Sequence, residues 1–350
     1  MKTIRDIDVE GKTVLVRVDF NVPMSEGKVT SDLRIRAALP TLEYLKENGA
    51  KKIVVMSHLG RPKGRDETLT MEPVAAALGM AFTKVSYVPE VSGEAVRKIV
   101  GQMKDGQILV LENLRFYPGE EANDVEFVRE ILKDTAAEVY VMDAFAVMHR
   151  EHATVVAAQE VAREMGVEYV YGLLVEKEVT TLLQVMETPR RPFVMIIGGA
   201  KVEDKAPLID KFAGIADRVI VGGKIAADGY ISTADNVYVA EDFDLDADGS
   251  KVDVGPLSMT KVADAIVDAE TVVWNGLMGK AEDPAYATAS TIVAEMMGEK
   301  TTATTVVCGG DTTGFVEELM EEHPSLDYTL LSTGGGAALE FLLNGTLIGL

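Results

Sequence analysis

The sequence predicts an α/β protein made of two doubly wound parallel-sheet domains joined by a helix. Three observations lead to this fold class. Apolar runs rich in Val and Ile alternate with stretches of helical period along the whole chain, and polar residues or glycines follow these runs directly. The length of 350 residues exceeds one ordinary core and suffices for two domains. Apolar strands separated by crossover helices form parallel sheets covered on both faces.

The first half contains four expected strands with helices between them. The apolar runs predict strands over residues 13–22, 52–59, 107–116 and 138–145. The stretches of helical period predict helices over residues 34–49, 72–82, 93–103 and 124–136. This alternation indicates one Rossmann-like domain over residues 1–170.

The second half repeats the pattern and indicates a second Rossmann-like domain over residues 193–335. Strands are expected over residues 192–201, 218–224, 270–276, 303–311 and 328–336. Residues 171–192 read as a joining helix that ends at a proline, and this helix is the expected hinge. Residues 336–350 are expected to return towards the first domain.

Composition and charge exclude several classes of protein. The formal net charge is −22, with 56 Asp and Glu against 34 Lys and Arg. We therefore do not expect nucleic acid as a partner for the surface as a whole, because its phosphate backbone needs a basic binding surface. No apolar run is long enough to cross a bilayer, and the N-terminus lacks the apolar core of a signal peptide. The single cysteine, Cys308, cannot form an internal disulfide. We therefore expect a cytoplasmic protein that binds neither nucleic acid nor membrane.

Cations and polar side chains follow the strands of the first half, although the chain as a whole is acidic. Because ligands bind outside the carboxyl ends of parallel strands, these residues are candidates for one site. Arginine forks match carboxylate and phosphate groups in two-point contacts, so several of them in one place would hold a small, multiply charged anion. The candidates are Asp19, Asn21, Arg34, His58, Arg61, Arg115, His149, Arg150 and His152.

Glycines follow the strands of the second half. The stretch "IIGGAKVEDK" supplies Gly198 and Gly199 after a strand and then Lys201 and Lys205, and three more strands end in glycine turns. Backbone N–H groups at glycine-rich helix starts bind phosphates, and lysines add positive charge. Asp311 follows Gly309 and Gly310, where a carboxylate could hold Mg²⁺ that bridges nucleotide phosphates. Four such turns in one domain favour a nucleotide site.

The two halves together indicate phosphoryl transfer between a nucleotide and a small anion. One domain would collect the anion and the other the nucleotide phosphates. In-line transfer between them would need a hinge that closes and expels water. The residues alone therefore indicate a two-domain kinase that acts on a small anionic substrate.

A series of motifs in this order resembles the phosphoglycerate kinase family. The motifs are "VLVRVDFNVP", "LRIRAALPT", "SHLGRP", "LENLRFYPGEE", "GGAKVEDK", "VVWNG", "GGDTT" and "STGGGAALEFL". The resemblance runs from about residue 11 to the C-terminus. It implies reversible transfer of a phosphoryl group between 1,3-bisphosphoglycerate and ADP, giving 3-phosphoglycerate and ATP, with Mg²⁺ as cofactor and a monomeric enzyme of glycolysis.

The resemblance also implies a role for each matching residue. Residues 1–170 would bind the acid substrate, through Asp19, Asn21, Arg34, His58, Arg61, Arg115 and Arg150. Residues 193–335 would bind the nucleotide, through Gly199, Lys201, Lys205, Asn275, Glu282, Gly309, Gly310, Asp311 and Thr312, with Asp311 as the metal ligand. Catalysis would depend on the residues that match those around the transferred group, which are Arg34, Lys201, Gly335 and Gly336.

The nucleotide half departs from the family pattern in several places. Lys224 stands where the family usually has a glycine, Leu277 replaces a typical proline, and Cys308 replaces a typical glycine. The segment 224–250 is shorter than usual, so we expect a shortened nucleotide domain. A non-catalytic family member that binds phosphoglycerate or a related anion, as a sensor or partner-binding protein, is therefore the alternative hypothesis.

Lys224 also raises a question of base specificity. A lysine stem could cover the base and offer its ammonium to a carbonyl, which guanine has and adenine lacks. This would weaken the binding of ATP and reduce discrimination against GTP. The competing interpretation is that Lys224 points into solvent, as most lysines do.

Overall fold

The computed structural model describes residues 1–350 and divides them into two compact units. Unit 1 contains Met1–Lys177 and Leu347–Leu350, and unit 2 contains Glu178–Thr346. The division lies within helix α7 (Leu173–Glu187), inside the segment expected to join the domains. The return to unit 1 begins at Leu347 and not at residue 336, because α13 (Gly336–Asn344) packs on α8 (Val202–Ala213) and Lys211 donates to the Leu343 carbonyl at 2.8 Å.

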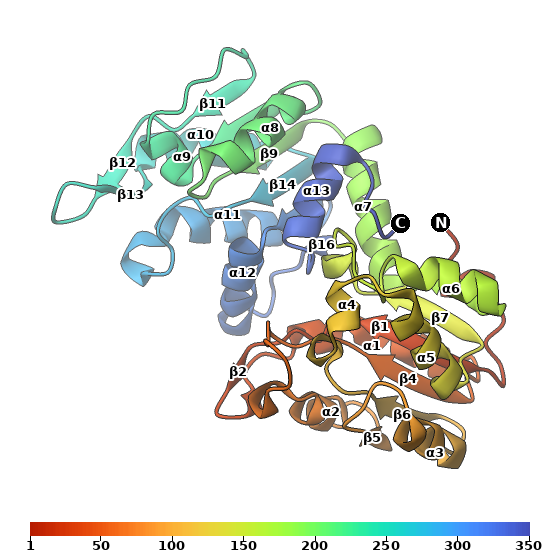
Figure 1. Cartoon of the computed structure of the whole chain (residues 1–350). Coiled ribbons are helices and arrows are strands. Elements are labelled where there is room, and N and C mark those ends of the chain that lie inside the picture. Colours follow the sequence, from red (N-terminus) through yellow and green to blue (C-terminus); the bar gives the residue numbers. More distant parts are fainter. The chain divides into compact units, whose positions relative to one another are not determined.

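Unit 1 is built on a sheet of six parallel strands in the order β5-β6-β4-β1-β7-β8 (Figure 1). The bounds are β1 (Thr13–Val18), β4 (Lys52–Met56), β5 (Val85–Tyr87), β6 (Gln107–Val110), β7 (Val139–Asp143) and β8 (Glu168–Tyr171). The four expected strands form the middle of the sheet and are buried along nearly their whole length. The two edge strands were not expected, because "VSY" and "EYVY" are short and mix polar with aromatic residues.

Helices cover both faces of the first sheet, as a parallel sheet requires. They are α1 (Leu33–Glu47), α2 (Glu72–Leu78), α3 (Glu94–Gln102), α4 (Pro118–Glu121), α5 (Val125–Thr135) and α6 (Ala157–Met165). Successive side chains of a strand point to opposite faces, so Val14, Val16 and Val18 of β1 share a core with α1 and α2. Arg17 lies between them in sequence and therefore points to the other face.

Unit 2 repeats this architecture with six parallel strands in the order β11-β10-β9-β14-β15-β16 (Figure 1). Their bounds are β9 (Phe193–Ile197), β10 (Arg218–Val221), β11 (Val237–Val239), β14 (Thr271–Asn275), β15 (Thr304–Cys308) and β16 (Leu330–Leu331). The helices, besides α7, α8 and α13, are α9 (Gly223–Ala227), α10 (Pro256–Asp268), α11 (Thr288–Gly298) and α12 (Gly310–Glu322). The prediction of two parallel-sheet domains is confirmed.

Two antiparallel hairpins lie outside the large sheets. In unit 1, β2 (Met24–Ser25) pairs with β3 (Lys28–Val29). In unit 2, β12 (Phe243–Leu245) pairs with β13 (Lys251–Val254). The segment 224–250, which the sequence indicated to be short, contains most of the five-residue helix α9, strand β11 and the first strand of the second hairpin, β12. None of the helices is long and apolar enough to cross a bilayer.

Candidate active site

The candidate residues of unit 1 follow the ends of strands β1, β4, β6 and β7 or open the next helix. Asp19 and Asn21 follow β1, His58 and Arg61 follow β4, and Arg34 is the second residue of α1. β1 lies between β4 and β7, and β6 lies beside β4, so their carboxyl ends meet along one edge of the sheet. The topology therefore collects residues that are separated by more than 100 positions in sequence.

Asp19 is the centre of the polar contacts in this cluster. It is almost fully buried, and its carboxylate accepts a hydrogen bond from the Arg34 guanidinium. Its other oxygen lies 3.9 Å from Nδ1 of His58 and accepts from the backbone N–H of Asn21 at 3.1 Å. The Asn21 side chain in turn accepts from the Gly60 N–H at 2.8 Å. Asp19, Asn21, Arg34 and His58 are thus brought together by direct contacts.

Arg115 joins the same cluster and Arg61 does not. The buried Arg115 donates to the Gly60 carbonyl at 2.6 Å and lies 3.5 Å from a Glu121 carboxylate oxygen. Burial lowers the pKa of Arg115, and the nearby positive charges of Arg150 and Arg17 act in the same direction. Arg61, although close in sequence to Gly60, is exposed and contacts none of the other candidates.

The histidines of the cluster are held in their neutral form. Burial lowers the pKa of His58 well below its ordinary value, and the charges of Arg17, Arg115 and Arg34 lower it further. Burial and the neighbouring arginines also lower the pKa of His152 to about 4. Several arginines therefore gather here beside neutral imidazoles, and guanidinium groups can bind an anion through two hydrogen bonds each.

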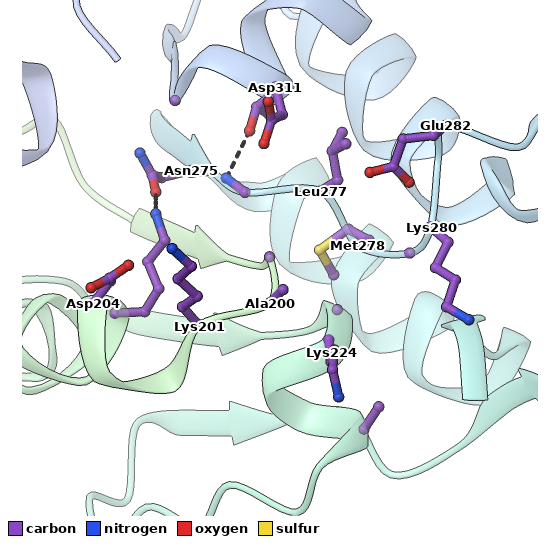
Figure 2. Close-up of a pocket in the computed structure, with 18 of the residues that line it drawn as sticks. Ala200, Lys201, Asp204, Lys224, Asn275, Leu277, Met278, Lys280, Glu282 and Asp311 are labelled. Carbon is purple, nitrogen blue, oxygen red and sulfur yellow. Dashed lines mark hydrogen bonds between the residues drawn. The ribbon is translucent and has the colours of Figure 1, made fainter. Parts of the chain in front are cut away.

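In unit 2 the candidate residues line one cavity of about 730 Å³. It contains every residue expected at the nucleotide and the transferred group in this half of the chain, namely Gly199, Lys201, Lys205, Asn275, Glu282, Gly309, Gly310, Asp311, Thr312, Gly335 and Gly336. In Figure 2, Lys201 and Asn275 lie on one side of the cavity, and Lys280 and Glu282 lie on the other. The structure therefore brings this whole set together.

Three helix N-termini meet at this cavity. Lys201 is the residue before α8, Gly309 and Gly310 begin α12, and Gly335 and Gly336 begin α13. The first N–H groups of a helix have no partner within it and carry the positive end of the helix dipole. Helix starts that converge in this way form a site for phosphate groups.

Close backbone contacts explain the glycines at the strand ends. Gly276 has φ +99°, and a Cβ atom there would lie 2.2 Å from the Gly198 carbonyl oxygen. A side chain at this position is therefore excluded both by conformation and by space. The Gly276 N–H donates to the Thr312 hydroxyl at 2.9 Å, which ties the end of β14 to the start of α12.

Lys205 is held in the cavity by Asn275, which is held in turn by Cys308. The Lys205 ammonium donates to the Asn275 side-chain oxygen, and the Asn275 amide donates to Sγ of Cys308 at 3.4 Å. Burial lowers the pKa of Lys205 and raises that of Cys308 to about 11. Cys308 thus acts as a small, buried, neutral group that orients the amide.

The donor set of the cavity fits a magnesium ion that is bound mainly through nucleotide phosphates. Asp311 is exposed at the start of α12, and no group of three or more acidic, His or Cys side chains gathers to form a complete metal site. Mg²⁺ in nucleotide sites commonly takes one or two carboxylates and completes its shell with phosphate oxygens and water. A single carboxylate beside a phosphate site matches that arrangement.

Residues of the hairpin β12–β13 also line the cavity, and the sequence did not lead us to predict this. Phe243, Ser250, Lys251 and Val252 line it, and the Lys251 ammonium lies 4.5 Å from the centre of the Phe243 ring. The segment "EDFDLDADGSKVDV" alternates apolar with acidic residues on both sides of Asp248-Gly249, a pair typical of hairpin turns, so the sequence does contain a signal for this hairpin.

Lys224 lines the cavity, but its ammonium group forms an ion pair with Asp228. Nζ lies 2.7 Å from both carboxylate oxygens of Asp228, four residues later in the chain. Both side chains are about half exposed. The lysine is thus tethered at the edge of the cavity by a local ion pair.

Comparison with known proteins gives the same family from sequence and from structure. The family model for phosphoglycerate kinase matches residues 4–241 and 228–345. The phosphoglycerate kinase of Dictyoglomus turgidum is 37 % identical over 385 aligned positions, covering 97 % of this chain and 94 % of that protein. The two family matches overlap at residues 228–241, within the segment 224–250.

Two solved structures extend the likeness to the whole fold. Phosphoglycerate kinase from Pyrococcus horikoshii OT3 matches with a TM-score of 0.84 at 27 % identity, covering 100 % of this chain and 97 % of that one. Phosphoglycerate kinase from Coxiella burnetii matches with a TM-score of 0.79 at 29 % identity, covering 99 % and 97 %. With two six-stranded sheets, the expected cavity in unit 2 and these relatives, the chain belongs to the phosphoglycerate kinase family.

Proposed function

We propose that this protein is a phosphoglycerate kinase that transfers a phosphoryl group reversibly between 1,3-bisphosphoglycerate and ADP, giving 3-phosphoglycerate and ATP. The observation that carries the proposal is the cavity in unit 2, where the complete expected set of nucleotide residues and three helix N-termini lie together. Family membership over 97 % of the chain supports a catalytic function and not the non-catalytic alternative.

In this proposal unit 1 binds the acid substrate. Arg34, Arg115, Arg150 and Arg61 supply charge to the phosphate and carboxylate groups, and His58, Asn21 and Asp19 orient them. The contacts of Asp19 with Arg34 and His58 support this assignment, because they fix two of the donors before the substrate arrives. A preformed donor loses little conformational entropy on binding.

Unit 2 binds ATP or ADP with Mg²⁺. Gly199, Lys201, Lys205 and the start of α12 would hold the phosphates, while Asn275 and Glu282 complete the nucleotide site. Asp311 would hold the metal, which would neutralise phosphate charge, and Thr312 supports the start of α12 through its bond to Gly276.

The chemical step needs positioning and charge neutralisation more than a general base. The transferring group in phosphoryl transfer resembles metaphosphate and spreads negative charge over its oxygens. Arg34, Lys201 and the backbone N–H groups of Gly335 and Gly336 are the donors that we assign to it. Preorganised donors of this kind stabilise the developing charge without reorganisation during the reaction.

We further infer a monomeric, cytoplasmic enzyme with small molecules as its only substrates. The acidic composition disfavours nucleic acid as a partner, and no helix is suited to a membrane. Gel filtration with light scattering would test the monomer.

A coupled assay with 3-phosphoglycerate, ATP and Mg²⁺ tests the proposal. We expect turnover that requires all three components, and inhibition by sulfate that raises the KM for 3-phosphoglycerate, since sulfate competes for the arginines. Lys201→Met should reduce turnover, whereas Lys98→Met, a change of an exposed lysine of α3, should not. Binding of 3-phosphoglycerate without turnover would instead support the sensor hypothesis.

A further inference from the structure

A buried charged cluster in unit 1 has no part in the function proposed above. It consists of Arg17 in β1, Glu120 in α4 and Thr154 in the segment before α6, and all three residues have 0 % exposure. A buried charge is costly unless it is paired and hydrogen-bonded, so a cluster of this kind requires an explanation. It lies against His58, one of the residues assigned to the acid substrate.

Every nitrogen of the Arg17 guanidinium has a defined acceptor. Nε donates to the Thr154 hydroxyl at 2.9 Å, Nη1 donates to the Val18 carbonyl, and Nη2 lies 3.2 Å from Nδ1 of His58. The charge is balanced by Glu120, whose carboxylate lies 3.8 Å from Nη2. The guanidinium therefore has one orientation.

Thr154 and Glu120 fix the directions of these hydrogen bonds. The Thr154 hydroxyl has one proton, which it donates to Glu120 at 2.7 Å, so it can only accept from Arg17. The Thr154 backbone N–H donates to the same carboxylate at 3.0 Å. Arg17, Thr154 and Glu120 thus form a chain of donors and acceptors with a single polarity.

This polarity determines the protonation of the His58 ring. A guanidinium has donors and no acceptor, so Nδ1 of His58 must accept the hydrogen bond from Nη2. The ring proton of the neutral imidazole then lies on Nε2. The charged groups around the ring are Arg17, Arg34 and Arg115 with the titratable His152, and opposite them Asp19, at 3.9 Å from Nδ1.

We propose that Arg17 is a positioning residue for the acid substrate, because it fixes His58 as the neutral Nε2–H tautomer that can donate to a carboxylate or phosphate oxygen. Thr154 and Glu120 act through Arg17 by setting its orientation and balancing its charge. This inference rests on the proposed function for the identity of the anion, but the tautomer follows from the geometry alone.

A fixed neutral tautomer has a functional consequence. An unconstrained histidine would titrate near pH 6.5 and would populate two neutral tautomers, of which only one presents a proton at Nε2. Burial, together with the charge of Arg17, lowers the pKa of His58, and the hydrogen bond from Arg17 selects one neutral tautomer. The KM for 3-phosphoglycerate should therefore show no titration of His58 between pH 6 and pH 8.

Nitrogen NMR of the histidine rings in the full-length protein tests the tautomer directly. The chain has four histidines, and His58→Gln identifies the His58 signals by their disappearance. The exposed His323 provides a reference for a ring in solvent. We expect the pattern of a neutral ring protonated at Nε2 for His58 throughout pH 6–8. An imidazolium or an Nδ1–H pattern in the wild type would overturn the proposal.

Two sets of variants test the positioning. Arg17→Met with Glu120→Gln removes both buried charges together, so no charge is left unpaired. We expect a second tautomer of His58 to appear and the KM for 3-phosphoglycerate to rise on the order of 10-fold, with a smaller change in kcat. Arg163→Met, a change of an exposed arginine in α6, is the matched control and should change neither quantity.

Thr154 supplies a milder pair of variants that keeps both charges. Thr154→Ser retains the hydroxyl and should preserve the wild-type tautomer of His58 and the KM for 3-phosphoglycerate. Thr154→Val removes the hydroxyl, so we expect the second tautomer of His58 to appear and the KM to rise, as in the variant that combines Arg17→Met with Glu120→Gln. Equal behaviour of the Ser and Val variants would contradict the role of the hydroxyl chain. A wild type that does not phosphorylate 3-phosphoglycerate would overturn the proposed function alone, because the spectra are recorded without substrate.

Discussion

The two units prepare for anions in different ways. Unit 1 uses charged side chains that are buried and paired before any ligand arrives, as in Asp19 with Arg34 and Arg17 with Glu120. Unit 2 uses backbone N–H groups at helix starts, with exposed lysines such as Lys201 at the edge. A side-chain site depends on the identity of each residue, whereas a backbone site depends on the path of the chain.

This difference bears on Leu277 and Cys308, where the resemblance to the family leads us to expect a proline and a glycine. The donors of the cavity are in place beside both residues. The Leu277 carbonyl still accepts from the Gly199 N–H at 2.8 Å, and Cys308 fits into the buried space beside Asn275. Hydrogen bonds between backbone groups do not depend on the identity of the side chain, so we expect substitutions in unit 1 to have the larger effects.

The largest effect is expected for Arg34→Ala, which removes a side-chain donor assigned to the transferred group. Turnover should fall by on the order of 10²–10⁵, the usual range for a lost charge contact of this kind. Arg36→Ala in the same helix removes an exposed arginine paired with Asp32 and should leave turnover unchanged. Steady-state kinetics measures both. Wild-type turnover in Arg34→Ala would place the transferred group elsewhere.

Asp143 gives unit 1 a pH-dependent stability, and burial raises the pKa of Asp253 in unit 2 in the same direction. Burial raises the pKa of its carboxyl group to about 7, although Oδ1 accepts from the backbone N–H groups of Leu174 and Val175 at the start of α7. Because the folded-state pKa is the higher one, the contribution of this group to stability is complete below about pH 4 and is lost as the pH rises to about 7. The loss amounts to at most about 4 kcal/mol.

Asp143→Asn tests this dependence, because asparagine keeps an oxygen acceptor and cannot ionise. Denaturant unfolding between pH 4 and pH 8 should show a decline for the wild type that is smaller in the variant, where only groups such as Asp253 still contribute to it. Asp105→Asn, at an exposed position of unit 1, is the control and should retain the decline. Parallel curves for wild type and Asp143→Asn would show that Asp143 is ionised in the folded protein throughout this range.

Asp311→Ala should affect only the metal-dependent part of nucleotide binding in unit 2. Mg²⁺ links this carboxylate to phosphate oxygens, so its loss should weaken Mg²⁺-dependent binding of ADP by at least about 10-fold. Binding without Mg²⁺ should remain, because the helix starts are unchanged. Calorimetry with and without Mg²⁺, using Asp235→Ala as an exposed control outside the cavity lining, measures the difference. Equal dependence on Mg²⁺ in the variant and the wild type would place the ion on another ligand.

The smallest effect is expected for Lys224→Gly. If Lys224 offers its ammonium to the base, the wild type discriminates weakly against GTP, and glycine restores the preference for ATP. The ion pair with Asp228 competes for the ammonium but is an exposed pair worth only about 0.3–0.5 kcal/mol. We therefore expect the ratio of kcat/KM for ATP and GTP to change by less than about 10-fold. A strong preference for ATP that the substitution leaves unchanged would contradict the idea.

The sequence by itself determined the fold class, the long central strands and the glycine turns that line the cavity of unit 2. The central strands are apolar throughout because both faces of a parallel sheet are buried, and this pattern is visible without any tertiary contact. The glycine turns were equally visible, since a turn that follows each strand lies at the carboxyl edge of the sheet. The edge strands β5 and β8 were not predicted, because they are short and only partly buried.

Only the tertiary structure decided which charges are paired. Arg17 lies in the middle of an apolar strand, and the sequence offered no sign that Thr154, 137 positions away, accepts its hydrogen bond or that His58 lies beside it. The contribution of the hairpin to the cavity of unit 2 could not be predicted from the sequence for a related reason. Its residues face the cavity only once β12 and β13 pair. Periodicity reports burial along one element, whereas hydrogen-bond partners and cavity walls come from elements that meet only in the folded chain.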